Sequence, residues 1–266
     1  MKKLIVIPTY NEKENITELM KVIFLVVPES HVLVVDDGSP DGTAKVVEEF
    51  SQKDKRIHLL KRTEKKGLGR AYIAGFKWGL ERGYDFISEM DADWSHPPRF
   101  LTAMYAAAMK NDFVVGSRYI KGGGSVNWSL GRKIISKCGS LYARVILGVP
   151  IYDFTGGFNG WHSKVLKAID LDGILTEGYS FQIELKYRAA RQGFKFAEFP
   201  LVFEERREGQ SKMSTAIVRE AIWKVWSLRF KNKRLDSAPS NKVKEAVQDQ
   251  IESIPIESIP VDSGRK

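Results

Sequence analysis

The chain has 266 residues, with 43% hydrophobic residues, 28% charged residues and a formal net charge of +9 at pH 7. These shares are those of a globular protein, and no apolar run approaches the roughly 18 residues that suggest a membrane span. We therefore expect one main folded body. Cys138 is the only cysteine, which excludes an intrachain disulfide framework and a cysteine-based zinc cluster and fits a reducing cytoplasm.

The basic excess predicts affinity for polyanions, which include nucleic acid, an anionic membrane face and phosphorylated substrates. From Asp236 onward the chain holds 4 basic and 6 acidic residues, so the excess belongs to the part before it. Residues 236–266 are rich in serine, proline and charge, and Ile251–Pro255 is repeated as Ile256–Pro260. This composition predicts a disordered tail.

Apolar runs of strand length alternate with helix-period segments through the first half, the pattern of parallel strands joined by crossover helices. The expected strands are Lys3–Ile7, His31–Asp36, Arg56–Lys61, Tyr84–Met90 and Asp112–Ser117. The expected helices are Asn11–Val27 and Asp41–Asp54, with Asn11 and Asp41 as N-caps, then Leu68–Arg82 and Pro98–Lys110. The second half predicts helices at Ser129–Leu147 and Ser180–Gln192 and a strand at Phe194–Glu205. The expected fold class is α/β, with a mostly parallel central sheet flanked by helices.

An aspartate pair, Asp91 and Asp93, follows the fourth expected strand. A carboxylate pair at a strand's exit can hold a hard divalent cation, and such a cation binds diphosphate oxygens. An exposed acidic turn explains the same two residues equally well. The segments 8–12 and 35–43 end the first and second strands, so parallel strands would bring all three segments to one sheet edge, where ligands bind. The second segment also reads as a tight turn with a helix cap.

A dinucleotide-binding fold is a competing interpretation, because Gly67 and Gly69 follow a strand and open a helix. Tyr72 occupies the place of the third glycine, and the pair follows the third strand when the fingerprint should follow the first. This interpretation is therefore disfavoured.

Seven motifs occur in order and together resemble one family. They are Pro8-Thr-Tyr-Asn-Glu12, Val35-Asp-Asp-Gly-Ser39, Asp91-Ala-Asp93, Gly116-Ser-Arg-Tyr119, Gly156-Gly-Phe158, Gly178-Tyr-Ser-Phe-Gln182 and Gly209-Gln-Ser-Lys-Met-Ser214. From Lys3 to Arg234 the chain resembles the inverting family 2 glycosyltransferases with a GT-A fold, and among them the polyprenyl-phosphate (dolichyl-phosphate) mannose synthases. The resemblance implies a Rossmann-like sheet and a glycosyltransferase activity.

The resemblance also implies a donor site. Pro8, Tyr10, Glu12, Val35 and Asp37 match positions that hold the guanine and ribose of GDP-mannose. Asp91, Ala92 and Asp93 match the Asp-x-Asp motif that contacts the sugar nucleotide and a Mg²⁺ or Mn²⁺ ion, with Asp93 the first choice as direct ligand. Similar enzymes often place a glutamine ligand two residues later, where this chain has Ser95, so Ser95 or a water would substitute.

Four basic residues match positions that face phosphate groups in such enzymes. Arg118, Arg206 and Lys212 match those that face the diphosphate and the acceptor phosphate, and Arg132 matches one beside the mobile acceptor loop. Cations are needed where a lipid phosphate approaches a diphosphate, because they offset the repulsion and the growing charge of the leaving group. Asp91, Asp93 and Arg118 are therefore the expected catalytic residues, and Arg118 and Arg132 the expected acceptor-phosphate ligands.

The implied reaction moves mannose from GDP-mannose to a polyprenyl monophosphate with inversion at the anomeric carbon. An enzyme that uses a UDP-sugar, such as UDP-glucose or UDP-N-acetylglucosamine, with the same acceptor remains open. So does a catalytically inactive scaffold that binds sugar nucleotides. A nucleic-acid-binding module is disfavoured, because the matched basic residues are interleaved with the donor motifs instead of forming one surface with stacking aromatics.

The predicted domain organisation is a catalytic domain at 1–212, an amphipathic helix at 213–235 and the tail at 236–266. The helix has an apolar face made by Ile217, Val218, Ala221, Ile222, Val225, Trp226 and Phe230, flanked by Arg219, Lys224, Arg229, Lys231, Lys233 and Arg234. This composition is typical of a helix at a membrane surface. We expect peripheral attachment to the cytoplasmic face of the membrane, although the helix could instead pack on the body or bind a membrane-protein partner.

Overall fold

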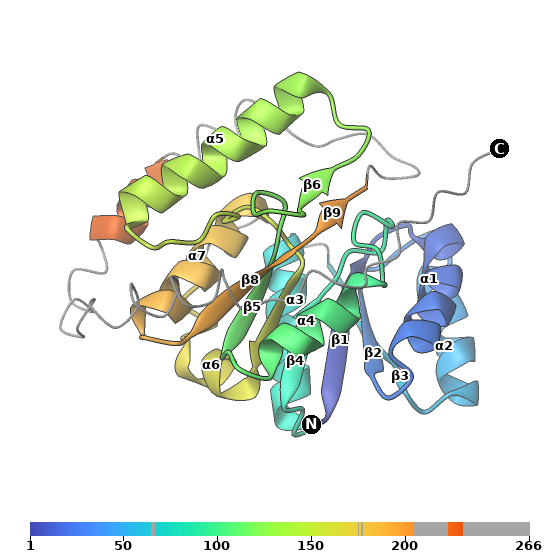
Figure 1. The fold of residues 1–266 in the computed structure, drawn as a ribbon. Helices are drawn as coiled ribbons and strands as arrows, with labels where there is room; N and C mark the ends of the chain where they lie inside the picture. The colour runs from blue at the N-terminus through green and yellow to red at the C-terminus, as the bar shows by residue number, and fades with distance from the viewer. Residues whose placement is uncertain (65–66, 175, 177, 205–222, 231–266) are drawn as a thin grey trace.

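A seven-stranded sheet forms the centre of the computed structural model, which describes residues 1–64, 67–174, 176, 178–204 and 223–230 (Figure 1). The strand order is β3-β2-β1-β4-β7-β5-β8. Its strands are β1 (Lys3–Thr9), β2 (His31–Asp36), β3 (Ile57–Lys61), β4 (Phe86–Glu89), β5 (Phe113–Ser117), β7 (Asn159–His162) and β8 (Phe196–Pro200). A second, two-stranded sheet pairs β6 (Gly124–Ser125) with β9 (Val202–Phe203).

The helices that join the strands lie on both faces of the sheet. They are α1 (Lys13–Val26), α2 (Thr43–Lys53), α3 (Leu68–Glu81), α4 (Phe100–Ala108), α5 (Leu130–Leu147), α6 (Ser163–Ala168) and α7 (Gly178–Arg191). The prediction of an α/β fold with a mostly parallel sheet flanked by helices is confirmed, and every strand expected in the first half is present within two residues at each end. The exception to parallel pairing in the large sheet is β7, which runs antiparallel to both β4 and β5 and was not expected.

The two expected N-caps were wrong. Helix α1 begins after Glu12, while Asn11 adopts a left-handed conformation with φ 62° before it. Helix α2 begins after Gly42, whose φ of 88° suits glycine. Asp41 lies one residue earlier, yet its carboxylate accepts the Thr43 N–H at 2.9 Å and satisfies an open donor of the first turn.

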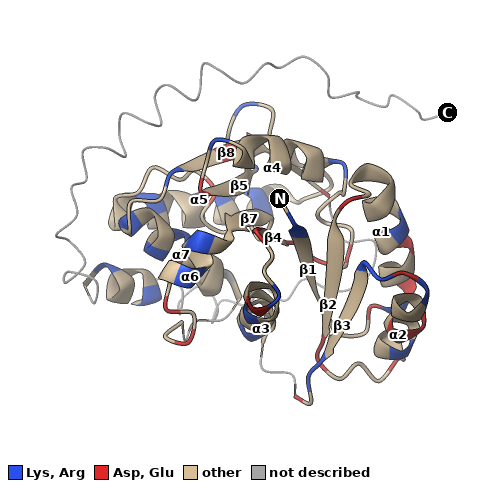
Figure 2. Cartoon of the chain, turned by 90° about the horizontal axis from the view of Figure 1, so that it is seen from below, with Lys and Arg blue, Asp and Glu red and all other residues tan. Residues whose placement is uncertain are grey.

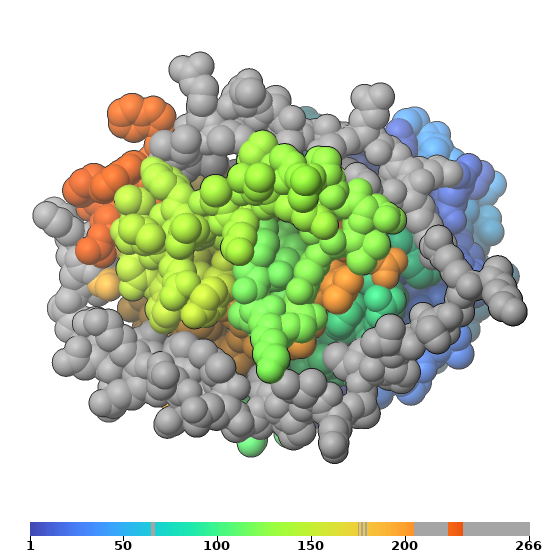
Figure 3. All heavy atoms as spheres, turned by 45° about the horizontal axis from the view of Figure 1, so that its top comes forward, coloured from blue at the N-terminus to red at the C-terminus, as the bar shows by residue number. Residues whose placement is uncertain are grey.

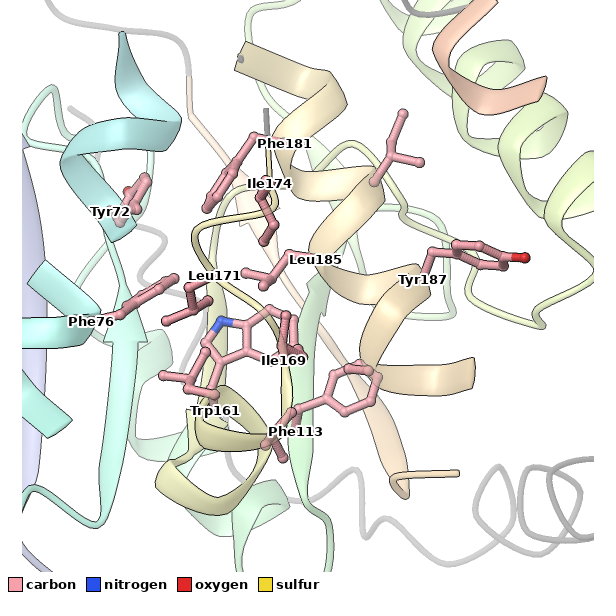
Figure 4. Packing of buried hydrophobic residues seen from close by; sticks show 14 of the residues in the cluster. Tyr72, Phe76, Phe113, Trp161, Ile169, Leu171, Ile174, Phe181, Leu185 and Tyr187 are labelled. Carbon is pink, nitrogen blue, oxygen red and sulfur yellow. The ribbon is translucent and has the colours of Figure 1, made fainter. Parts of the chain in front are cut away.

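Two hydrophobic cores form because successive strand residues point to opposite faces of the sheet. Leu4 and Val6 of β1 join the core under α3, α6 and α7, whereas Ile5 and Ile7 join the core under α1, α2 and α4. The first core is rich in aromatic rings (Figure 4). Tyr72 of α3 stacks with Phe76 of the same helix and with Phe181 of α7, and Trp161 of β7 stacks with Phe113 of β5. Both faces of the sheet are thereby buried, as a parallel sheet requires.

The segments beyond residue 204 are described in part. Residues 223–230 are helical and lie beside the C-terminal end of α5 (Figure 1). The rest of the predicted helix 213–235 and the tail 236–266 lie outside the described residues, so the domain boundaries stay predictions. In the described part of the chain, no helix is both long enough and apolar enough to cross a membrane.

Helix α3 approaches the sheet closely at Gly75. A methyl group there would lie 2.4 Å from Val6 Cγ1 and 3.3 Å from Val35 Cγ2, and both valines are fully buried. We expect Gly75→Ala to lower the free energy of unfolding by about 1–3 kcal/mol, because overpacking outweighs the gain in helix propensity. Urea denaturation measures the change.

Gly139 in α5 is the matched control, because a methyl group there meets its nearest neighbour, Thr155 Cγ2, at 4.0 Å. Gly139→Ala should leave the stability unchanged or raise it by up to about 1 kcal/mol. Equal effects of the two substitutions would show that α3 can move away from the sheet.

Candidate active site

The loops that follow β1 and β2 are joined by hydrogen bonds at one edge of the sheet. The backbone N–H groups of Asn11, Glu12 and Lys13 donate, each at 3.0 Å, to side chains of the second loop. The acceptors are Ser39 Oγ, Thr43 Oγ1 and Asp41 Oδ2, in that order. The two predicted donor-binding segments, 8–12 and 35–43, therefore form one connected surface, on which Tyr10 is exposed.

The adjacent aspartates of the second loop have different surroundings. The Asp36 carboxylate is buried and accepts Thr9 Oγ1 at 3.0 Å, the Ser39 N–H at 3.0 Å and Ser39 Oγ at 2.5 Å, so it shapes the turn. The Asp37 carboxylate forms an ion pair with Arg62 at 3.0 Å. Of the predicted donor-binding residues, Val35 is fully buried in the sheet, so only its backbone could contact a ligand.

Asp91 lies at the exit of β4, beside two aromatic side chains. Tyr72 Oη donates to Asp91 Oδ1 at 3.0 Å, and burial, reinforced by the Asp91 charge, raises the pKa of Tyr72 well above its usual value of 10.0. The Asp91 N–H donates to His96 Nδ1 at 3.0 Å, which leaves the proton of the neutral ring on Nε2. Tyr72 and His96 were not predicted as site residues, and together they fix where this carboxylate lies.

Asp93 and Ser95 form the next part of the site. The Ser95 N–H donates to Asp93 Oδ1 at 3.1 Å, and Ala92 and Asp93 are both buried. The Ser95 hydroxyl is fully buried and makes no hydrogen bond to any described residue. An oxygen-only donor set of two carboxylates and a hydroxyl fits a hard cation such as Mg²⁺ or Mn²⁺. Among the described residues, no group of three or more His, Cys, Asp and Glu side chains could hold a metal ion.

Arg118 follows β5 and is held by a buried carboxylate. Its Nε and Nη2 atoms donate to the two Asp153 oxygens at 2.7 Å each, and Nη2 also donates to Thr155 Oγ1 at 2.8 Å. Burial alone would raise the pKa of Asp153, but the Arg118 charge and hydrogen bonds hold it below its usual range. Three aromatic rings, of Tyr119, Trp128 and Phe203, surround the guanidinium at 5.2–5.7 Å. These hydrogen bonds and ring contacts fix the plane of the Arg118 guanidinium.

Arg132 and Arg118 contact the same aromatic ring, that of Trp128. The Arg132 guanidinium carbon is 4.1 Å from the centroid of Trp128, and that of Arg118 is 5.3 Å from the same ring. The Trp128 indole N–H is buried and has no hydrogen-bond acceptor among the described residues. Two arginines and an unsatisfied N–H donor suit an anionic group. The other two predicted phosphate ligands, Arg206 and Lys212, lie outside the described residues.

Behind these residues lies a buried polar network that the sequence did not reveal. The Lys186 ammonium, fully buried in α7, donates to the carbonyls of Asp153, Phe154 and Gly156 at 3.0, 3.1 and 2.6 Å. It thereby holds the turn that carries Asp153. Burial lowers the pKa of Lys186 to about 8, although the negative charges of Asp153 and Glu89 oppose the shift.

Glu89 is the second member of this network and lies on β4, two residues before Asp91. It accepts Trp161 Nε1 at 2.6 Å and a hydrogen bond from Gln182 Nε2. Burial raises the pKa of Glu89 to about 7, although these donors favour the ionised form. Glu184, in the same helix as Gln182, is not part of this network. It forms an ion pair with Arg188 at 2.5 Å.

We expect Asp153→Ala to lower the free energy of unfolding by about 3–5 kcal/mol, because the buried Arg118 charge would lose its partner. The exposed pair of Lys77 and Asp172 supplies the control. Asp172→Ala removes the same kind of ion pair from water and should cost less than about 1 kcal/mol. Urea denaturation of both variants tests the difference. Similar losses in the free energy of unfolding would contradict the claim that the buried ion pair of Asp153 and Arg118 matters more than an exposed one.

Comparison with known proteins identifies the family. Residues 4–170 match the model of glycosyl transferase family 2. An undecaprenyl-phosphate mannosyltransferase of Micrococcus luteus is 49% identical over 86% of this chain and 95% of its own length. A polyprenol monophosphomannose synthase of Mycolicibacterium smegmatis is 47% identical over 88% of this chain and 89% of its own.

Solved structures share the fold at low sequence identity. A glucosyl-3-phosphoglycerate synthase from Mycobacterium tuberculosis in complex with phosphoglyceric acid has a TM-score of 0.62 and 16% identity, over 85% of this chain and 79% of that one. A mannosyltransferase from Pyrobaculum calidifontis, solved with GDP-Man and Mn²⁺, has a TM-score of 0.55 and 18% identity, over 92% of this chain and 68% of that one. The family match covers most of the described sheet, and the chain belongs to glycosyl transferase family 2.

Proposed function

We propose that the protein transfers mannose from GDP-mannose to a polyprenyl monophosphate, with inversion at the anomeric carbon, and releases GDP. The observation that carries this proposal is the 49% identity to an undecaprenyl-phosphate mannosyltransferase, across nearly the whole length of that relative. The geometry supports it, because the fold supplies both kinds of group that the reaction needs. Two aspartates, Asp91 and Asp93, follow β4, and two arginines, Arg118 and Arg132, contact the ring of Trp128.

The donor would occupy the connected loops after β1, β2 and β4. Tyr10, exposed at this edge, can stack on the guanine ring, while Glu12 and Asp37 can accept hydrogen bonds from the base or the ribose. Pro8, Val35 and Ala92 would contribute backbone and shape. The backbone N–H groups of Asn11, Glu12 and Lys13 are hydrogen-bonded to the second loop, so the proposed nucleotide pocket would be formed before the donor binds.

Asp91 and Asp93, with the Ser95 hydroxyl beside them, would hold a Mg²⁺ or Mn²⁺ ion. When bound, such an ion offsets negative charge on the donor diphosphate. Tyr72 and His96 orient Asp91, and the Ser95 N–H orients Asp93, so the chain itself fixes these carboxylates before any ligand arrives.

The acceptor phosphate is ionised near neutral pH, so its oxygen needs no strong general base to attack. A new bond forms between that oxygen and the anomeric carbon as the bond from this carbon to the GDP oxygen breaks, with the departing electron pair left on the diphosphate. Arg118, Arg132 and the Trp128 N–H would hold the two phosphate groups close despite their repulsion. Arg206 and Lys212 are proposed to add positive charge on the diphosphate side.

The lipid acceptor places the reaction at a membrane surface. We propose peripheral attachment to the cytoplasmic face of the membrane. Nucleic acid is not a proposed partner, because the basic residues of the site are interleaved with the donor motifs in the sequence instead of forming one extended basic surface with stacking aromatic rings.

Purified protein with labelled GDP-mannose, Mn²⁺ and a short-chain prenyl phosphate should release label into the organic phase. Asp93→Ala should reduce this transfer at least about 100-fold, because charge stabilisation at the diphosphate is lost. Asp172→Ala, at an exposed aspartate, is the control and should keep full activity.

The donor preference is measured in the same assay. Labelled UDP-glucose and UDP-N-acetylglucosamine should give little product, and chelation of the cation should stop the mannose transfer until Mn²⁺ or Mg²⁺ is restored. Faster transfer from a UDP-sugar would reverse the assignment of the donor. Label that stays in the aqueous phase with every donor would contradict transferase activity on this acceptor.

A further inference from the structure

We propose that α5 and the helix at residues 223–230 together form a docking surface for a bilayer that contains anionic lipids. The apolar residues of this surface are Leu130, Ile134, Leu141 and Val145 of α5, with Trp223, Trp226 and Phe230 of the second helix. We call this set the bilayer-docking surface. The inference rests on the proposed function in one respect, since a lipid acceptor gives the surface its purpose.

Helix α5 exposes an apolar stripe in addition to the face that it buries. Its buried residues are Ser140, Ala143 and Leu147, whereas four large apolar side chains are exposed. Leu130, Ile134, Leu141 and Val145 are exposed by 55–78%. Their spacing of four, seven and four residues places them on one face of the helix. A helix that packs only on its own body would turn such a stripe inward, so a contiguous apolar face in water marks a site of interaction.

The second helix is anchored to the body and presents aromatic rings outward. Val225 and Leu228 are buried in the same core as α7, whereas Trp223, Trp226 and Phe230 are exposed. The rings of Trp226 and Phe230 stack with centroids 5.6 Å apart. The two helices come to one face of the molecule in Figures 1 and 3, where residues 223–230 adjoin the C-terminal end of α5. Tryptophan is the side chain most suited to the boundary between headgroups and acyl chains.

The charges on the two helices have one sign. Helix α5 carries Arg132, Lys133, Lys137 and Arg144 and no acidic residue, and residues 223–230 carry Lys224 and Arg229 and no acidic residue. Lys133, Lys137 and Arg229 are exposed, and Figure 2 shows blue segments on α5 and α7. Cations that border an apolar stripe match anionic headgroups over hydrocarbon. This complementarity favours a bilayer over a second copy of the chain, whose own face would repeat the same charges.

The bilayer-docking surface begins where the acceptor phosphate is proposed to bind. Arg132, in the first turn of α5, lies over Trp128, which also borders Arg118. Val126 and Leu130, which lie two residues before and two residues after Trp128 in the sequence, are both exposed. A lipid whose phosphate contacts the two arginines would therefore leave its chain beside apolar side chains. The surface and the acceptor site form one path from hydrocarbon to the reacting phosphate.

Sedimentation with vesicles tests the surface in the full chain. The protein should bind vesicles of phosphatidylcholine with a minority of phosphatidylglycerol more strongly than vesicles of phosphatidylcholine alone. The double variant Ile134→Ser with Leu141→Ser should weaken binding at least about tenfold, the effect of withdrawing one full apolar side chain from the bilayer. Lys133→Glu with Lys137→Glu should remove the preference for the anionic vesicles.

Matched controls lie on other faces of the molecule. Leu25 and Met109 are exposed apolar residues on α1 and after α4, and Lys53 and Lys55 are exposed cations near the end of α2. Leu25→Ser with Met109→Ser, and Lys53→Glu with Lys55→Glu, should leave binding unchanged. Equal losses in docking and control variants, or no vesicle binding by the unaltered protein, would overturn the proposal.

Two further measurements separate this inference from the proposed function and from self-association. The Ile134→Ser, Leu141→Ser variant should keep transfer to a water-soluble short-chain prenyl phosphate and lose transfer to polyprenyl phosphate in vesicles. Vesicle binding as predicted with no transfer in either assay would support the surface and reject the function. In sedimentation velocity, a dimeric unaltered protein with a monomeric double variant would show that this face binds a second copy. That outcome would contradict the proposal that the face binds a bilayer.

Discussion

The buried carboxylate of Asp153 is the constraint on which the position of Arg118, a proposed acceptor-phosphate ligand, depends. A charge with no access to water must be paired, and Arg118 supplies two hydrogen bonds of 2.7 Å. The turn that carries Asp153 must then stay closed, and Lys186 closes it through three backbone carbonyls. One fully buried ion pair thus fixes the end of β5, the turn before β7 and the middle of α7 relative to one another.

This arrangement explains why the guanidinium of Arg118 is placed with so little freedom. Arginine pairs through a planar fork, so two bonds to one carboxylate set the orientation of the whole group. The Trp128 ring then joins this fixed cation to Arg132 at the start of α5. Pre-organised positive charge of this kind costs nothing to assemble when two anions are brought together, which is the main demand of the proposed reaction.

The first half of the fold could be predicted from the sequence, because parallel strands buried on both faces give continuous apolar runs such as Leu4–Ile7 and Val32–Val35. The position of the proposed donor site followed from these strands, since β1, β2 and β4 are parallel and their exits lie at one edge of the sheet. The structure joins the two predicted loops directly, through the N–H groups of residues 11–13. The roles of individual residues at that edge came from the family resemblance and stay predictions.

The second half was harder to predict for identifiable physical reasons. Strand β7 has the sequence Asn-Gly-Trp-His, which is short and carries no alternation, and tertiary pairing with β4 and β5 makes it a strand. Gly160 fits there because a methyl group would lie 2.3 Å from the Phe86 ring. Glu89 and Lys186 were missed because a charged residue is usually exposed, and nothing in the sequence says which one is buried.

The two proposed substrates differ in solubility, and this difference accounts for the position of the arginine cluster. The donor is a water-soluble anion, so its loops can open to solvent at the exits of β1, β2 and β4. The acceptor keeps its chain in hydrocarbon, so only its phosphate can travel to meet the donor. The reacting groups can therefore meet only at a boundary, and cations must lie at that boundary to hold both. Arg118 follows β5, Arg132 lies in the first turn of α5, and both contact Trp128 at the place where we propose that an aqueous site borders a bilayer.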